Sequence, residues 1–215
     1  MKNNIQVVKI GASVIIQNGE FRKYVLDEIV HKVKQAWEQS THSVLVVSGA
    51  IKFGMVELGY QQMPNKKDIK ALQRCACVGQ PRLMSEYLDS LKRYKLIGSQ
   101  LLVTYHNLDN EEEERNIEER VKDDIAHGII TLVNYNDGID SKGIELEDEK
   151  GIKIRDNDML AAQIAKYINA NKLIMLTNPK ENGTMGGRKT KQEAINQAKA
   201  AGIEVKVQDY RQKYT

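Results

Sequence analysis

The chain has 215 residues, of which 41% are hydrophobic and 28% charged, so it is long enough to bury a large core and has a globular composition. Its 32 basic and 29 acidic residues leave a net charge of +3, which is too small to indicate a nucleic-acid partner and does not hinder binding of anionic small molecules. The amino-terminal residues lack the layout of a signal peptide, and no apolar run is long enough to cross a bilayer. We therefore expect a cytoplasmic protein with no membrane partner.

Short runs rich in β-branched residues alternate along the chain with longer segments of helical periodicity. The segment 68–94 should be interrupted near Gly79-Gln80-Pro81, because proline cannot donate a hydrogen bond and disfavours helix before it. Asp156 is expected to cap the helix that follows it. In order, we expect strand 5–10, helix 21–39, strand 43–47, helices 51–58 and 68–94, strand 97–104, helix 111–127, strand 129–133, helix 156–168, strand 173–176, a helix ending at 201 and strand 203–207.

Residues 144–155 alternate apolar and polar side chains around a turn, which predicts a β-hairpin that projects from the body. The alternation of strands and helices elsewhere predicts an α/β fold, a three-layer α/β/α sandwich with a largely parallel central sheet, in one domain over residues 1–215. Cys75 and Cys77 lie two residues apart in an expected helix and point in different directions. We expect both to be buried reduced thiols and find no set of metal ligands around them.

Polar residues follow four of the expected strands: Lys9-x-Gly11-x-Ser13, Ser48-Gly49-Ala50, Asn134-x-Asn136-Asp137 and Asp156-Asn157-Asp158. The carboxyl ends of parallel strands open on one edge of a sheet, so these groups should converge there. Each group alone is more often a turn, a helix cap or a solvated lysine. Their joint occurrence predicts a site.

A fifth feature, Gly186-Gly187 followed by Lys191, precedes the last helix, where backbone N–H groups can bind a phosphate. Phosphoryl transfer needs the acceptor and the nucleotide in line and the developing negative charge neutralised. Two lysines, glycine turns and carboxylates that orient the lysines supply those parts. The sequence contains no Walker pattern and no protein-kinase signature, so the common nucleotide-binding folds are not indicated.

The polar motifs together resemble the glutamate 5-kinases of the amino-acid kinase family. The resemblance implies ATP-dependent phosphorylation of the γ-carboxylate of glutamate, a phosphotransferase reaction with a carboxyl acceptor that opens proline biosynthesis. It runs in order from Val7 to about Gly202 and divides the chain into an acceptor half, 1–150, and a shortened nucleotide half, 151–215. The motifs that carry it are Val8–Val14, Ser48–Ile51 with Gly54 and Leu58-Gly59, Val78–Met84, Asn134–Asp137 and Asp156–Asp158.

The resemblance also implies a role for each matched residue. Lys9 and Lys191 would stabilise the transferring phosphoryl group, and Asp158 would hold the two lysines. ATP would bring Mg²⁺, held mainly by phosphate oxygens and water, and family members usually form homo-oligomers. Ser48, Asp137 and Asn157 would bind glutamate in a pocket shaped by Asn134 and Asn136, and the nucleotide would contact Lys9, Gly11, Thr177, Asn178, Gly186, Gly187 and Lys191.

The chain departs from the family pattern in the nucleotide half. Asn178 stands where the family has aspartate, the loop to the glycine turn is short, and the turn reads Gly183-Thr184-Met185-Gly186-Gly187 instead of Gly-Thr-Gly-Gly-Met. We also expect the chain to lack the closing strands of the family domain and the RNA-binding-like domain that many members have at the C-terminus. Two alternatives therefore stand beside the kinase: a non-catalytic amino-acid sensor or partner subunit, and a kinase for another small acceptor.

Overall fold

The computed structural model describes residues 4–65, 67–140, 156–178 and 185–211, and for residues 185–189 it describes the backbone alone. Within these ranges six parallel strands form one sheet in the order β5-β6-β4-β1-β7-β8. The strands are β1 (Asn4–Ile10), β4 (Thr41–Val47), β5 (Ile97–Val103), β6 (Ile129–Tyr135), β7 (Lys172–Thr177) and β8 (Glu204–Asp209).

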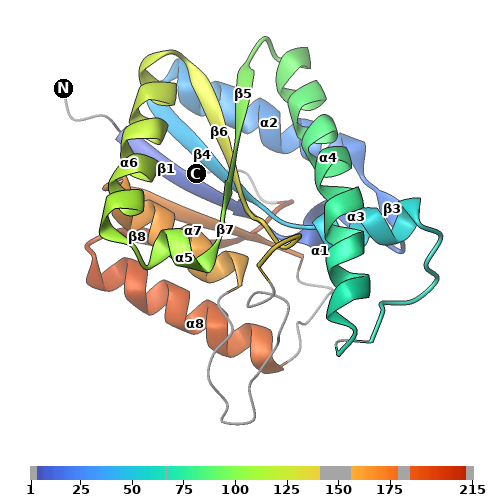
Figure 1. Cartoon of the computed structure of the whole chain (residues 1–215). Helices are drawn as coiled ribbons and strands as arrows, with labels where there is room; N and C mark the ends of the chain where they lie inside the picture. Colours follow the sequence, from blue (N-terminus) through green and yellow to red (C-terminus); the bar gives the residue numbers. More distant parts are fainter. Residues whose placement is uncertain (1–3, 66, 141–155, 179–184, 212–215) are drawn as a thin grey trace.

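Helices cover both faces of the sheet (Figure 1), which confirms the three-layer α/β/α fold. One face packs against α2 (Lys23–Glu38), α3 (Ala50–Glu57) and α4 (Ile69–Arg93), and the other against α6 (Glu111–Ala126), α7 (Asn157–Tyr167) and α8 (Met185–Ala200). The short elements α1 (Ala12–Ile15), β2 (Ile16–Gln17), β3 (Glu20–Phe21) and α5 (Tyr105–Leu108) complete the described part, and residues 144–155, the expected hairpin, lie outside it.

The chain changes direction across the sheet at β1. From β1 it passes to β4 on one side, and it later returns from β6 to β7 on the other side of β1. Parallel α/β sheets bind ligands beyond the strand ends at such a switch point. The fold therefore places the candidate site around the carboxyl ends of β1, β4, β6 and β7.

The expected interruption of the helix near Pro81 is wrong, because α4 runs unbroken from Ile69 to Arg93 with Pro81 inside it. Proline forfeits one backbone hydrogen bond, at a cost of about 3 kcal/mol. Buried residues on both sides of Pro81, among them Ala76 and Leu83, pack against the core and offset that cost. Gly79 is a contact residue rather than a breaker: a Cβ there would lie 1.9 Å from the carbonyl oxygen of Ala50 on α3.

The crossing of α3 and α4 yields a stability prediction. A Cβ at Gly54 would lie 1.8 Å from the backbone oxygen of Cys75, so Gly54→Ala must push the helices apart. We expect a loss of about 1–3 kcal/mol, although alanine favours helix. Exposed Ser85→Ala on α4 is the control and should stay within about 0.5 kcal/mol. Denaturant unfolding measures both, and equal midpoints would show that the helices do not touch at Gly54.

Cys75 is buried, as expected, but Cys77 is exposed, which corrects the expectation for the second thiol. The two residues are on different faces of α4, and only the face of Cys75 turns toward the core. Periodicity assigns residues to helix faces, whereas the width of the buried face depends on the neighbouring helix.

Candidate functional site

Lys9 reaches the site because of the alternation of side chains along β1. Val8 and Ile10 pack into the core beneath α2, and Val7 packs into the core beneath α7. Lys9 is on the same side of the strand as Val7. Since α7 begins at Asn157, close to the carboxyl end of β1, the Lys9 ammonium meets the first turn of that helix.

Asp158 binds two lysines at once. Its Oδ1 lies 2.6 Å from Lys9 Nζ and its Oδ2 lies 2.9 Å from Lys191 Nζ. The aspartate is 3% exposed, and the side chains of Lys9 and Lys191 are 12% and 27% exposed. The three groups carry a net charge of +1 at the end of the sheet. The structure thus brings together Lys9, Asp158 and Lys191, the three residues to which the family resemblance gives this arrangement.

Burial by itself would raise the pKa of Asp158, because a charged carboxylate loses hydration. The charges of Lys9 and Lys191, and their hydrogen bonds to the carboxylate, outweigh burial and hold this pKa below its usual value. Asp158 therefore stays ionised at neutral pH and keeps both ammonium groups in place.

Asp156 ties the two helices of the site together. Its Oδ1 accepts hydrogen bonds from the backbone N–H groups of Asp158 and Met159, which confirms it as the N-cap of α7. Its Oδ2 accepts a hydrogen bond of 2.8 Å from Thr190 Oγ1 on α8. Thr190 thus helps to set the position of Lys191, a role that sequence reasoning missed because it depends on the packing of α7 on α8.

On the acceptor side, amides link four elements. Asn157 Nδ2 donates to the carbonyl oxygen of Val47 at the end of β4 and, over 2.8 Å, to Asn134 Oδ1 on β6. Asn134 Nδ2 donates over 2.8 Å to Gln80 Oε1 on α4. Both hydrogens of Asn157 Nδ2 are used, so its Oδ1 is the atom left to accept from a ligand. Asn134 is 3% exposed and orients its neighbours.

Asp137 is a half-buried carboxylate just beyond β6. Burial, with a smaller effect from the negative charge of Asp140, raises its pKa to about 6. No ion pair to a described lysine or arginine offsets this, unlike at Asp158. A carboxylate held this way gains a cationic partner readily, so Asp137 is suited to bind an ammonium group.

Ser48 and Asn136 lie at neighbouring strand ends. Ser48 follows β4 and directly precedes Gly49. Gly49 is the N-cap of α3, and its φ of +121° is favourable for glycine. Asn136 follows β6, and its backbone N–H donates to the carbonyl oxygen of Val103. Ser48, Asn136 and Asp137 therefore approach the same region from adjacent strands, as the order β6-β4 requires.

The residues expected to bind nucleotide lie at the ends of β1 and β7. Thr177 Oγ1 donates over 3.4 Å to the carbonyl oxygen of Gln208, and Asn178 Nδ2 donates over 3.3 Å to the carbonyl oxygen of Ser13. An aspartate at 178 would have no hydrogen to donate there. A Cβ at Gly11 would lie 3.6 Å from Lys9 Nζ, so its absence leaves room beside that ammonium. Gly186 and Gly187 are in the first turn of α8.

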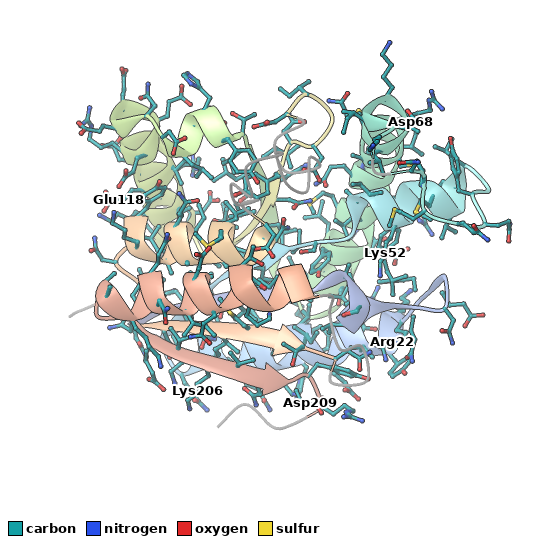
Figure 2. The ribbon with its side chains drawn as sticks, turned by 90° about the horizontal axis from the view of Figure 1, so that it is seen from below. Arg22, Lys52, Asp68, Glu118, Lys206 and Asp209 are labelled. Carbon is teal, nitrogen blue, oxygen red and sulfur yellow. The ribbon has the colours of Figure 1, made fainter. Side chains whose placement is uncertain are left out.

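Sequence reasoning missed Arg22, which is 9% exposed and holds the turn after β1. Its guanidinium donates to the carbonyl oxygens of Ser13 and Val14 and, over 2.8 Å, to the hydroxyl of Tyr210, whose ring it also covers. In Figure 2 the arrowheads of β7 and β8 point toward the side of the molecule on which Arg22 is labelled. A basic residue just before a helix gave no signal, because its partner Tyr210 comes from a distant segment.

A cavity of about 30 Å³ lies on the acceptor side, lined by Ala50, Ala76, Cys77, Gln80, Tyr135, Asn136, Asp137 and Gly138. A larger hollow of about 750 Å³ lies between α2 and the strands β1, β7 and β8, and its lining includes the first residues of four strands, Asn4, Thr41, Lys172 and Glu204. We place the site at the smaller cavity, because the Lys9–Asp158–Lys191 cluster and the amides are at the strand ends next to it.

Residues 4–207 match the model of the amino acid kinase family. The chain is 32% identical over 191 residues to glutamate 5-kinase 1 of Bacillus subtilis (strain 168), which covers 85% of this chain and 50% of the relative. It is 36% identical over 173 residues to glutamate 5-kinase of Lactococcus lactis subsp. lactis (strain IL1403), covering 80% of this chain and 62% of the relative. The chain thus spans between about half and two thirds of the length of these relatives.

Solved structures share the fold. Carbamate kinase of Giardia superposes with a TM-score of 0.64 at 14% identity, covering 98% of this chain and 94% of the other. Isopentenyl phosphate kinase of T. acidophilum superposes with a TM-score of 0.62 at 15% identity, covering 96% and 92%. None of the helices in the described ranges is long and apolar enough to span a membrane.

Proposed function

This chain belongs to the amino acid kinase family, and from that premise we propose that it transfers the γ-phosphoryl group of ATP to the γ-carboxylate of L-glutamate. The observation that carries the proposal is the cluster in which Asp158 holds Lys9 and Lys191 within 2.6 and 2.9 Å at the sheet edge. Its relatives named glutamate 5-kinase support glutamate as the acceptor. The product would be L-glutamyl 5-phosphate, the first intermediate of proline biosynthesis.

In the proposed reaction an oxygen of the γ-carboxylate attacks the γ-phosphorus of ATP, and the bond from that phosphorus to the bridging oxygen breaks as ADP leaves. No proton has to be removed from the acceptor, because the carboxylate is already ionised. Negative charge spreads over the transferring group, and the ammonium groups of Lys9 and Lys191 neutralise it. Asp158 touches neither reactant in this scheme. It is a positioning residue that keeps the lysines aligned.

The two substrates would occupy different parts of the strand edge. The acceptor half, residues 1–150, contributes Ser48, Asn136 and Asp137 at the ends of β4 and β6, and Asn157 adds its Oδ1 from α7. The nucleotide half, residues 151–215, contributes Lys191 and the first turn of α8, where backbone N–H groups can bind phosphate oxygens. Lys9 lies between the two and serves both substrates.

ATP would arrive with Mg²⁺, which neutralises phosphate charge and orients the nucleotide. No group of three or more His, Cys, Asp or Glu residues suited to a metal occurs in the described part of the chain. An Mg²⁺ ion held by phosphate oxygens and water, as this ion prefers, would need no such group.

The test is glutamate-dependent release of ADP from Mg-ATP, with hydroxylamine added to trap the acyl phosphate as its hydroxamate. Trapped product, dependent on both substrates, is the expected result. ADP release without a glutamate-derived hydroxamate would assign the kinase to another acceptor. Thermal stabilisation by glutamate with no ADP release would assign the chain as an amino-acid-binding relative. The hydrogen bond from Asn178 to the carbonyl oxygen of Ser13 favours this second function.

Asp137 predicts the pH dependence of substrate binding. With a pKa of about 6 in the free protein, its carboxylate is about one tenth ionised at pH 5 and about nine tenths ionised at pH 7. Since only the ionised form pairs with the substrate ammonium, KM for glutamate should fall about tenfold over that range. Asp137→Asn should raise KM and abolish the pH dependence. Equal pH profiles of KM for the two proteins would contradict this role.

A rise in pH, which should strengthen glutamate binding through Asp137, should reduce the contribution of the same residue to the stability of the fold. Its pKa is raised on folding, so the native state binds its proton more tightly than the unfolded chain does, and Asp137 loses stabilising effect as pH rises from about 4 to about 6. Above pH 6, Asp137→Asn should therefore be more stable than the parent protein, with no such gain near pH 4. Thermal unfolding at the two pH values separates this effect from general damage.

A further inference from the structure

The amides on the acceptor side form a directed chain. It starts at the carbonyl oxygen of Val47, which can only accept, so the atom of Asn157 that faces it must be Nδ2. The same Nδ2 donates to Asn134 Oδ1, which leaves Asn134 Nδ2 to donate to Gln80 Oε1. Each amide is thereby fixed in one orientation. The chain ends at Gln80, whose NH₂ group must point away from Asn134.

Gln80 Nε2 is buried and has no hydrogen-bond partner within the part of the chain that the structure describes. A buried donor without a partner costs about 1–3 kcal/mol. The amide cannot avoid this cost by rotating, because a rotated Gln80 would turn its Nε2 toward the donor Nδ2 of Asn134. The protein thus holds an unused N–H donor in place at the end of an ordered chain.

Gln80, which carries the unused donor, lines a cavity that is also lined by a carboxylate residue. Gln80 and Asp137 both line the cavity of about 30 Å³ beyond β6. A space of this size accommodates a small polar group rather than a whole ligand. An N–H donor and a carboxylate that line the same cavity are suited to the two charged substituents on the Cα of an amino acid. The amide N–H group of Gln80 would bind the α-carboxylate of the ligand, and Asp137 would bind its ammonium group.

We propose that Gln80 Nε2 binds the α-carboxylate of the acceptor and so makes the site specific for α-amino acids over acceptors that lack this carboxylate. The inference rests on the proposed function, which requires the γ-carboxylate to face Lys9. Asn157 is adjacent to Asp158, and the amide chain runs from there through β6 to α4, away from the lysines. Gln80 is therefore at the end of the site where the α-substituents lie.

The test compares L-glutamate with isoglutamine, its α-amide, in the whole chain by calorimetric titration. The parent protein should bind glutamate at least tenfold more tightly than isoglutamine. In Gln80→Glu, Oε1 still accepts from Asn134, but the pocket-facing atom becomes a negatively charged acceptor. Glutamate should then bind at least tenfold more weakly, whereas isoglutamine, whose amide can donate to the new carboxylate, should bind equally well or better, so that the preference is reversed.

Gln35→Glu, the same change at an exposed position of α2, is the control and should leave both affinities unchanged. Gln80→Met removes the donor without adding charge and should lose the preference for glutamate. If Gln80→Glu does not fold, this variant tests whether Gln80 binds the α-carboxylate. An unchanged preference in a folded Gln80 variant would overturn the assignment of Gln80 alone. Failure of the parent protein to bind glutamate would overturn the proposed function together with this inference.

Discussion

Lys191→Ala should lower kcat for acyl-phosphate formation by about 10²–10³-fold, because one of the two cations that face the transferring group is lost. Asp158 keeps its bond to Lys9 in this variant, so the fold should be retained. Lys9→Ala should have an effect at least as large, since Lys9 lies between the two proposed substrate sites and is more buried than Lys191. Single-turnover measurement with saturating Mg-ATP separates the chemical step from nucleotide binding.

The matched control for Lys191→Ala is Lys199→Ala on the same helix, an exposed lysine two turns further along α8. It removes one positive charge from the same helix at a position outside the proposed site, so it should leave kcat unchanged. If Lys191→Ala and Lys199→Ala were equally active, the lysine cluster would have no part in the transition state, and the mechanism proposed for this chain would be wrong.

Asp158→Asn should both destabilise the protein and inactivate it. Breaking a buried ion pair costs about 3–5 kcal/mol, because the remaining charge is left buried without its partner. In Asp158→Asn the charge left without its partner is the ammonium group of Lys9, and the ammonium group of Lys191 remains nearby. The pKa of Asp158 is lowered on folding, so its contribution is fully present above its ordinary pKa near 4 and is lost as pH falls below that value. The destabilisation should thus be large at pH 7 and should decrease as the pH falls below about 4.

A double variant distinguishes the structural role of this pair from its chemical role. Lys9→Met with Asp158→Leu replaces the buried ion pair by apolar groups of similar size, which restores stability in many proteins. Lys191 is 27% exposed and can turn to solvent. We expect the double variant to regain most of the stability that Asp158→Asn loses and to remain inactive. Recovery of activity together with stability would show that the cluster is structural only.

The control for these variants is Asp89→Asn, which removes a carboxylate from an exposed position of α4. Its unfolding free energy should stay within about 0.5 kcal/mol of the parent value. The comparison shows that the loss in Asp158→Asn comes from the burial of the Lys9–Asp158–Lys191 cluster and not from removal of a negative charge as such.

Local patterns in the sequence determine the elements of this protein. Val25, Ile29 and Val33 recur at helical spacing and are buried in α2, and the continuous apolar run in β4 is typical of a strand that is covered on both faces. Alternation of such segments leads to a parallel sheet between helices. Because carboxyl ends of parallel strands share an edge, the sequence also determines that Lys9, Ser48 and Asp137 lie along one edge of the sheet.

Contacts between distant segments decided the rest. Pro81 is inside a helix because buried side chains on both sides of it pack against the core, and no local rule contains that information. Arg22 and Thr190 gave no signal in the sequence, and Gln80, although it is part of the motif Val78–Met84, gave no indication of its hydrogen bond. Each has a partner more than 30 residues away: Tyr210, Asp156 and Asn134. The sequence determined which chemical groups meet at the sheet edge, because strand direction is local, whereas their orientation and charge depend on burial and on hydrogen bonds that only tertiary packing creates.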